Sequence, residues 1–370
     1  MLEHRFAGPP FTIGVEEELM LVDAETLDLG HGIEAILDGV DPELGGQVKP
    51  ELFQAVLEVA TTPCRTVGEA TAQLAALRRA VSDVAERNGY LVGAAGTHPF
   101  GLGEDQRIVE RERYRELAAE LGWIARQELI FGTHVHVAID GADKAIYVAD
   151  GIRRYLPLLL AMSANSPYWR GERTGMMSTR TAVFRAFPRV GVPPHYGTWE
   201  IYSRRVETMM EAGAIDDYTY LWWDVRPHPN LGTVETRVFD QQTRLDATAS
   251  LAAITHALAH ALCRLFDDGE VLVEVPTELV DDNKVRAALR GLEGDLVDFP
   301  HRKVVPAPDM LRHLAQTVRE DAQELGCEAE LDGIEELIRR GTGARRQLEL
   351  VDGGTDLRGL VAEIVEHSRV

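Results

Sequence analysis

The chain has 370 residues, of which 45% are hydrophobic and 26% are charged, so it can bury a substantial core. Its 60 acidic residues outnumber 38 basic ones, and the net charge of −22 argues against a nucleic acid or an anionic membrane as a partner. A small anionic substrate stays open, because local arginines or Mg²⁺ could hold it. Three scattered cysteines, a start unlike a signal peptide and the lack of a long apolar run predict a cytoplasmic protein without a disulfide framework or a spanning helix.

The stretch 12–22, TIGVEEELMLV, is predicted to be a β-strand because β-branched and large apolar residues fill most of it. Side chains alternate between the faces of a strand, so Glu16 and Glu18 point the same way, with about 7 Å between their Cα atoms. Two carboxylates that close repel each other unless a cation lies between them. A solvated strand face would explain the pair, but the flanking apolar residues favour oxygen ligands for Mg²⁺ or Mn²⁺. Glu17 falls on the apolar face, and the sequence offers no reason for it.

The stretch 50–62 is predicted to begin as a helix and to end as a strand at 56–62. Glu51 and Glu58 are seven residues apart, which places them on one face of a helix but on opposite faces of a regular strand. Glu58 is the stronger candidate for a site. A helix follows over 66–88, with apolar residues every three or four positions and Gly89 as its stop. A short strand at 90–96 and a helix at 104–121 come next.

The stretch 130–139, IFGTHVHVAI, is predicted to be another alternating strand. His134 and His136 share one face with Gly132, and Glu128 has the same parity. A histidine on a strand is more often structural than a metal ligand, but two histidines in phase with a glutamate make a site equally reasonable. The His-x-His spacing would also suit zinc, although no cysteine lies nearby to favour it.

A helix is predicted over 145–164, and the segment 165–195 after it is long, rich in Gly, Pro, Ser, Thr and Arg, and without hydrophobic periodicity. Such a segment in a compact chain is usually functional or disordered. Its arginines form either a solvated loop or a clamp for phosphates or a carboxylate, and we expect it to be mobile without ligand. These arginines are Arg170, Arg173, Arg180, Arg185 and Arg189.

The region 217–240 is predicted to hold two strands separated by the turn PNLG. In the second strand Glu235, Arg237 and Phe239 should share a face. A glutamate beside an arginine is often only an ion pair, but the nearby Asp224 and Arg226 favour a polar site. Helices are predicted over 246–266 and from 276 onward, with a break at GTGA, 341–344. The two histidines one turn apart in the first of these helices are interpreted as structural, because no glutamate follows the first.

Eight of these stretches stand in the order found in one protein family. They are GVEEELMLVD at 14–23, ELFQAVLEVATTP at 51–63, GTHVHV at 132–137, NSPYWRG at 165–171, STRTAVF at 178–184, DVRPHPNLGTVETRVFD at 224–240, DNKVRAALRGL at 282–292 and GTGARRQ at 341–347. Together they span nearly the whole chain. The chain resembles the glutamate–cysteine ligase family 2, which groups carboxylate–amine ligases related to glutamine synthetase.

The resemblance implies an α+β fold: a glutamine synthetase-like funnel of antiparallel strands with helices packed behind it, formed by residues 1–370 as one catalytic domain. It implies ATP, Mg²⁺ or Mn²⁺, and a γ-glutamyl phosphate attacked by the amine of cysteine. By position, the residues expected to bind divalent cations are Glu16, Glu18, Glu58, His134 and Glu235. Arg180 and Arg237 are expected to neutralise the transferring phosphate, and Arg180 and Arg226 are assigned to cofactor binding.

Three readings remain open from the residues. The first is a ligase that uses glutamate, ATP and either cysteine or another amine, since nothing in the sequence indicates a cysteine pocket. The second is a metal-dependent hydrolase that uses His134, His136 and carboxylates on a water. The third is a non-catalytic binding protein on the same scaffold. The lack of a GxxxxGK[ST] loop argues against P-loop chemistry, and the oligomeric state is left open, with a homo-oligomer as one option.

Overall fold

The strand β1 (Ile13–Asp23) lies at the centre of a seven-stranded sheet in a computed structural model that describes residues 1–370. It pairs antiparallel with β3 (Val56–Ala60) along one edge. Along the other edge β5 (Gly132–Ala138) and β4 (Tyr90–Gly93) pair with it one after the other. The strand order is β10-β11-β5-β1-β3-β2, with β4 beside β1, and every pairing in this sheet is antiparallel.

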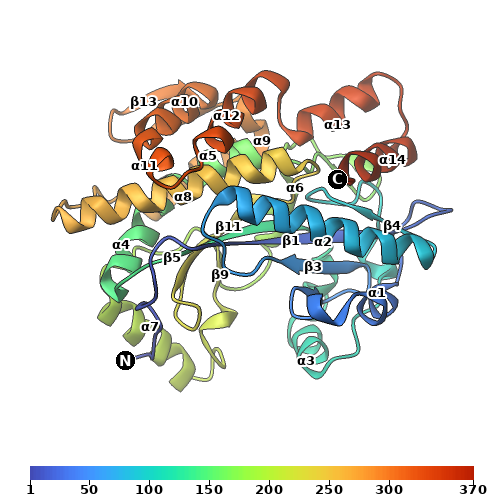
Figure 1. Ribbon diagram of the computed structural model, residues 1–370, viewed down its shortest axis with the longest axis horizontal. Coiled ribbons are helices and arrows are strands. Elements are labelled where there is room, and N and C mark those ends of the chain that lie inside the picture. Colours follow the sequence, from blue (N-terminus) through green and yellow to red (C-terminus); the bar gives the residue numbers. More distant parts are fainter.

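The alternation of β1 separates two faces of the sheet, as predicted. Ile13, Val15 and Leu19 are buried in the main hydrophobic core on what we call the helix face. The long helices α2 (Val67–Arg87) and α8 (Leu245–Asp267) run along this face (Figure 1). The opposite face, which we call the site face, carries the polar side chains described below.

The remaining elements complete these layers. The other helices are α1 (Ile33–Gly39), α3 (Glu112–Leu121), α4 (Ala142–Arg153), α5 (Leu156–Ser163), α6 (Thr179–Phe184), α7 (Trp199–Glu211), α9 (Thr277–Arg290), α10 (Ala307–Thr317), α11 (Arg319–Glu324), α12 (Glu328–Arg340), α13 (Gly343–Asp352) and α14 (Leu357–Ser368). The other strands are β2 (Val48–Pro50), β6 (Tyr168–Trp169), β7 (Glu172–Arg173), β8 (Val190–Gly191), β9 (Trp222–Trp223), β10 (Val225–His228), β11 (Thr233–Asp240), β12 (Asp295–Asp298) and β13 (Lys303–Pro306).

The two long helices expected from hydrophobic periodicity are confirmed. Thr66 caps α2, since its hydroxyl accepts a hydrogen bond from the Glu69 amide at 3.1 Å. Gly89 follows the helix with φ of +79°, a conformation that favours glycine. By length and composition α8 could cross a membrane, but 72% of its most apolar window is buried inside the protein, as in the core helix of a soluble protein.

Three predicted helices were wrong in their extent or in their secondary structure. Residues 51–55 are not helical, because the amide of Gln54 and the carbonyl of Leu52 pair with the backbone of residues 107–109. The helix predicted over 145–164 divides into α4 and α5, and Pro157, which has no N–H to donate, lies in the first turn of α5. The helix predicted at 104–121 begins only at Glu112. The hairpin β12–β13 was not foreseen.

The segment 165–195 is structured rather than an open loop. It contains β6, β7, α6 and β8, and its first half is fixed to the end of β11. The fully buried carboxylate of Asp240 accepts hydrogen bonds from the Asn165 amide at 2.8 Å and from the hydroxyls of Ser166 at 2.7 Å and Ser178 at 2.8 Å. This anchoring holds α6 against the site face. With its antiparallel sheet and packed helices, the protein has the predicted α+β class.

Candidate functional site

Neighbouring strands place carboxylates and imidazoles side by side on the site face. Glu18 on β1 stands opposite Glu58 on β3, Glu16 stands opposite His134 on β5, and Glu235 on β11 stands opposite His136. Because cross-strand partners lie within about 5.5 Å, the antiparallel register brings residues from four strands into one cluster. All five residues predicted to bind metal belong to it: Glu16, Glu18, Glu58, His134 and Glu235.

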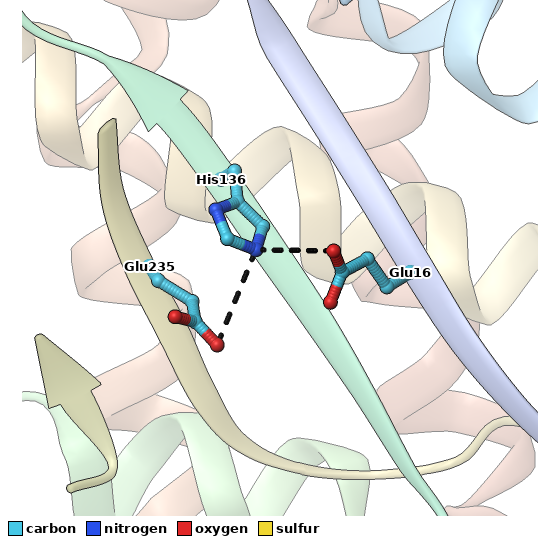
Figure 2. Close-up of side chains that lie close together, drawn as sticks. All are labelled: Glu16, His136 and Glu235. Carbon is cyan, nitrogen blue, oxygen red and sulfur yellow. Dashed lines mark ion pairs between the residues drawn. The ribbon is translucent and has the colours of Figure 1, made fainter. Parts of the chain in front are cut away.

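The tightest convergence is between Glu16, His136 and Glu235, which reach toward one another from β1, β5 and β11 (Figure 2). The His136 Nε2 lies 3.6 Å from Glu16 Oε1 and 4.0 Å from Glu235 Oε1, and one ligand atom from each residue lies within 4.8 Å of the others. His136 Nδ1 lies 3.1 Å from the Thr233 hydroxyl, which orients the ring. His136 Nε2 is buried and has no hydrogen-bond partner. Three donor atoms of this kind suit a divalent cation.

His134 joins Glu16 to Glu18 rather than forming part of this triad. Its Nδ1 lies 3.3 Å from Glu16 Oε2, and its Nε2 lies 3.9 Å from Glu18 Oε1 and has no hydrogen-bond partner. Burial lowers the pKa of His134. For His136 burial acts in the same direction, but the carboxylates of Glu16 and Glu235 outweigh it and raise the pKa. The sequence singled out both histidines but favoured His134, whereas the geometry gives His136 an equal place.

Glu235 is held from two sides by arginines. Arg226 Nε donates to Glu235 Oε2 at 2.6 Å, and Arg237 pairs with the other oxygen. Burial opposes ionisation of Glu235, but the two guanidiniums outweigh it and hold its pKa well below the usual range. Arg226 also donates through NH1 to the carbonyls of Thr219 at 3.0 Å and Leu221 at 2.8 Å. Only its NH2 group is therefore free of these contacts.

An irregularity in β11 contradicts one predicted face. Thr236 pairs with Val135, but Phe239 pairs with Thr133, so β11 carries one extra residue against β5. This bulge turns Phe239 to the helix face, where it is fully buried in the main core. Glu235 and Arg237 share the site face as predicted, but Phe239 does not.

Two further glutamates, Glu51 and Glu128, lie beside this cluster. They line a pocket whose walls also include Glu18, Arg180 and Arg237. Burial, with the nearby Glu18, raises the pKa of Glu128 to about 8. Burial also raises the pKa of Glu51 well above its usual value, with Glu58 and Glu18 adding to the effect. The nearby guanidiniums of Arg237 and Arg180 favour ionisation of Glu128, and that of Arg237 favours ionisation of Glu51, but they do not outweigh burial and the neighbouring carboxylates.

Glu51 and Glu128 were noticed in the sequence but not assigned to the site. Both lie outside regular strands, so alternation could not place them. The parity of Glu128 with His134, and the spacing of Glu51 from Glu58, were the only signals available.

Arg180 reaches the same pocket from α6, a short helix capped by Ser178. Its NH2 group lies 3.5 Å from the Arg237 carbonyl, and its Nε is buried without a partner. The Nε of Arg237 is also buried and unpaired. A Cβ atom at Gly132 would lie 2.2 Å from Arg180 NH2, so glycine at this position makes room for the guanidinium. Two arginines with free donors beside acidic groups can bind an anion that itself binds a cation.

The other four arginines of 165–195 do not line this pocket, which contradicts a five-arginine clamp. Arg170 pairs with Glu104, Arg173 with Asp352 and Arg185 with Asp281, while Arg189 donates to the carbonyl of Tyr220. Their partners lie far apart along the chain, so no local pattern in the sequence indicates this division.

The fold and site define an α+β protein with an acidic, histidine- and arginine-bearing cluster on one face of an antiparallel sheet. The model of the glutamate–cysteine ligase family 2 matches residues 12–367. A relative from Rubrobacter xylanophilus named "Putative glutamate–cysteine ligase 2-1" is 43% identical, over 100% of this chain and 97% of its own. A "Putative glutamate–cysteine ligase 2" from Sorangium cellulosum is 38% identical, over 97% and 96% respectively. The chain belongs to the glutamate–cysteine ligase family 2.

Solved structures with the same fold are far more distant in sequence. A bifunctional glutathione synthetase from Pasteurella multocida superposes with a TM-score of 0.71 at 13% identity, over 97% of this chain and 52% of that longer chain. A glutamate–cysteine ligase from Francisella tularensis, solved in complex with AMP, superposes with a TM-score of 0.68 at 12% identity, over 100% of this chain and 90% of that one. At such low identity these likenesses bear on the fold alone.

Proposed function

We propose that this protein is an ATP-dependent carboxylate–amine ligase that joins glutamate to cysteine through a γ-glutamyl phosphate. One observation carries the proposal: a cluster of carboxylates and imidazoles meets the free donors of Arg180 and Arg237 on one face of the sheet. Transfer of a phosphoryl group to a carboxylate gathers several negative oxygens, and this pairing of groups suits that charge. Membership in the family supports glutamate and cysteine as the substrates.

The proposed ligands of the divalent cations, Mg²⁺ or Mn²⁺, all lie on the site face. They are Glu16, Glu18, Glu58, His134 and Glu235, to which the geometry adds His136. Two buried imidazole nitrogens without partners and several carboxylates fit such cations. When bound, the cations reduce the charge repulsion between phosphate and carboxylate oxygens.

The arginines have separate tasks in this proposal. Arg180 and Arg237 present unpaired N–H groups to the pocket, where they would bind the oxygens of the transferring phosphate. Arg180 would also contact the nucleotide. The NH2 group of Arg226 is free for such a contact, while its Nε donates to Glu235 and its NH1 donates to the carbonyls of Thr219 and Leu221. The planar guanidinium suits this role better than an ammonium, because it donates two parallel hydrogen bonds.

The wider assignments rest on the same proposal. We propose that residues 1–370 form one catalytic domain, since the main core cluster extends from Phe6 to Ile334. Cytoplasmic location is supported by the three buried cysteines, none of which forms a disulfide. The substrates would be the small molecules glutamate, ATP and an amine.

The test is an assay of ADP release by the full-length protein with ATP, Mg²⁺ and glutamate, with and without a panel of amines. We expect release to require both glutamate and an amine, and to be fastest with cysteine. Faster release with another amine would keep the ligase class and overturn cysteine as the substrate. Release that is independent of any amine would overturn the ligase.

A pair of variants controls this assay. Arg180→Lys should lower the rate by roughly 10²–10³, because it removes donors aimed at the transition state. Arg264→Lys should leave the rate unchanged, since Arg264 on α8 pairs with Asp321 away from the site face. Equal rates for the two variants would contradict the role of Arg180.

A further inference from the structure

A fully buried ion pair lies directly behind the proposed metal ligands. Glu17, between Glu16 and Glu18 on β1, points to the helix face, where its two carboxylate oxygens each accept a hydrogen bond from Arg78 of α2 at 2.7 Å. The side chains of Glu17 and Arg78 are 0% and 2% exposed. The Thr248 hydroxyl of α8 donates to Glu17 at 2.8 Å. The glutamate that had no explanation in the sequence is thus the anchor of β1 to two helices.

Every N–H group of the Arg78 guanidinium is used. Besides the two bonds to Glu17, NH2 donates to the Gln242 carbonyl at 2.8 Å. NH1 donates to the carbonyls of Thr243 at 2.8 Å and Ser368 at 3.4 Å. Because a guanidinium has five N–H donors in a fixed fork, this arrangement allows one position of the group and no other residue type can reproduce it.

These contacts connect two strands that do not touch. In the sheet β5 separates β1, which carries Glu16 and Glu18, from β11, which carries Glu235. The ladder between β5 and β11 is continuous over Thr233–Thr236 but is interrupted by the bulge after Thr236, so its register changes toward the end of β11. Gln242 is the second residue after the end of β11 at Asp240. Arg78 therefore connects the segment after β11 to the middle of β1 on the helix face of the sheet.

We propose that Arg78 is a positioning residue that, through Glu17, sets the distance between the cation ligands on β1 and the ligand on β11. The inference rests on the proposed function, in which Glu16, Glu18 and Glu235 bind divalent cations. A buried ion pair is a weak source of stability, because desolvation of the charges offsets their attraction. Its proposed role here is geometric. The ion pair restrains movement of β1 perpendicular to the plane of the sheet, whereas the hydrogen bonds between strands act within that plane.

The test is the binding of Mn²⁺ to the full-length protein by isothermal titration calorimetry, with thermal melts of the same samples. Arg78→Lys keeps the charge but removes the fork, and we expect its affinity for Mn²⁺ to fall roughly 10–100-fold, as for other residues that orient metal ligands. Arg153→Lys is the matched control. Arg153 is also buried, 2% exposed, and donates to the carbonyls of Pro193 and Val275, away from β1 and β11. It should lose stability but keep its affinity within about twofold.

A second variant covers the case in which Arg78→Lys fails to fold. The double substitution Glu17→Leu with Arg78→Met replaces the ion pair by apolar side chains, an exchange that often preserves a fold. We expect it to fold and to bind Mn²⁺ as weakly as Arg78→Lys. Wild-type affinity in either folded variant would overturn the positioning role. If the wild-type protein itself bound no Mn²⁺, the proposed function would fail instead, so the two failures are distinguishable.

Discussion

Glu18 on β1 and Glu58 on β3 stand directly opposite each other on the site face. Like charges in this arrangement destabilise a sheet. Lys49 relieves only one of them, through its ion pair with Glu58 at 2.9 Å. Burial, together with the charge of Glu16, raises the pKa of Glu58 to about 7. The cluster therefore concentrates like charges that a divalent cation of the kind proposed above would offset.

The first prediction concerns the two carboxylates of β1. Glu16→Gln and Glu18→Gln should each abolish ATP turnover, because each removes a negatively charged oxygen ligand. Glu18→Gln should not lower the melting temperature, since loss of its charge relieves repulsion with Glu58. Glu16→Gln should lower it, because burial opposes the charge of Glu16 but His136 and His134 outweigh it and hold the pKa of this carboxyl well below its usual range. ADP release and a thermal melt on each variant are the measurements. Near-normal turnover in either variant would mean that the residue is not a metal ligand.

The second prediction separates Glu235 from Arg237. Glu235→Gln should raise the Mg²⁺ concentration needed for half-maximal activity, whereas Arg237→Lys should lower kcat by roughly 10²–10³ without changing that concentration. Glu235→Gln should also lower the melting temperature, because the buried Arg226 and the partly buried Arg237 lose their counter-charge. The melt therefore cannot decide the role of Glu235, and the Mg²⁺ titration must. If Glu235→Gln needed the same Mg²⁺ concentration as the wild type, Glu235 would be only an ion-pair partner of the arginines and not a metal ligand.

The third prediction uses two glycines on the site face. A methyl group at Gly132 would lie 2.2 Å from Arg180 NH2, so Gly132→Ala should displace the guanidinium and lower kcat at least tenfold. At Gly14 the nearest atom to an added Cβ is 3.8 Å away, in His136. Gly14→Ala should therefore keep normal activity. Steady-state kinetics on both variants provide the comparison, and equal rates would show that the position of Arg180 is not critical.

The fourth prediction is a pH dependence of stability. Burial lowers the pKa of His256 to about 4, against about 6.5 in an unfolded chain. Between these values the unfolded chain binds a proton that the folded chain does not, so stability falls as the pH drops below 6.5, by about 2 kcal/mol at pH 5. The variant His256→Gln lacks this titrating imidazole, so its stability does not fall for this reason as the pH drops. Urea unfolding at pH 7 and pH 5 should show the stability gap between wild type and variant narrowing by about that amount. A constant gap would place the His256 pKa near its ordinary value.

The fifth prediction revises the expectation that the whole of 165–195 is mobile. The amides of Met177 and Thr179 bond to the carbonyls of Ala288 and Ser166 at 2.8 and 3.0 Å, so they should exchange slowly without ligand. Ligand-dependent ordering is expected only over 185–195. Hydrogen exchange with and without an ATP analogue and Mg²⁺ is the measurement. Rapid exchange at Met177 would contradict the anchoring, and equal protection over 185–195 in both states would exclude a lid there.

The sequence by itself determined which residues share a face within one strand or helix. The common face of Glu16 and Glu18, the apolar stripe of α2 and the turn before β11 all follow from local periods of 2 and 3.6 residues and from turn chemistry. These periods depend only on neighbours along the chain. They were enough, with the order of the motifs, to indicate the family.

Tertiary structure alone decided which of these faces meet. The place of His136 beside Glu235, the selection of Arg180 from five arginines and the Arg78 partner of Glu17 each join residues far apart in the sequence. The bulge that turns Phe239 away from Glu235 depends on how β11 pairs with β5. Local periods fix the direction of a side chain, but register between strands and packing across the sheet depend on the free energy of burying the whole core, which no single stretch of sequence specifies.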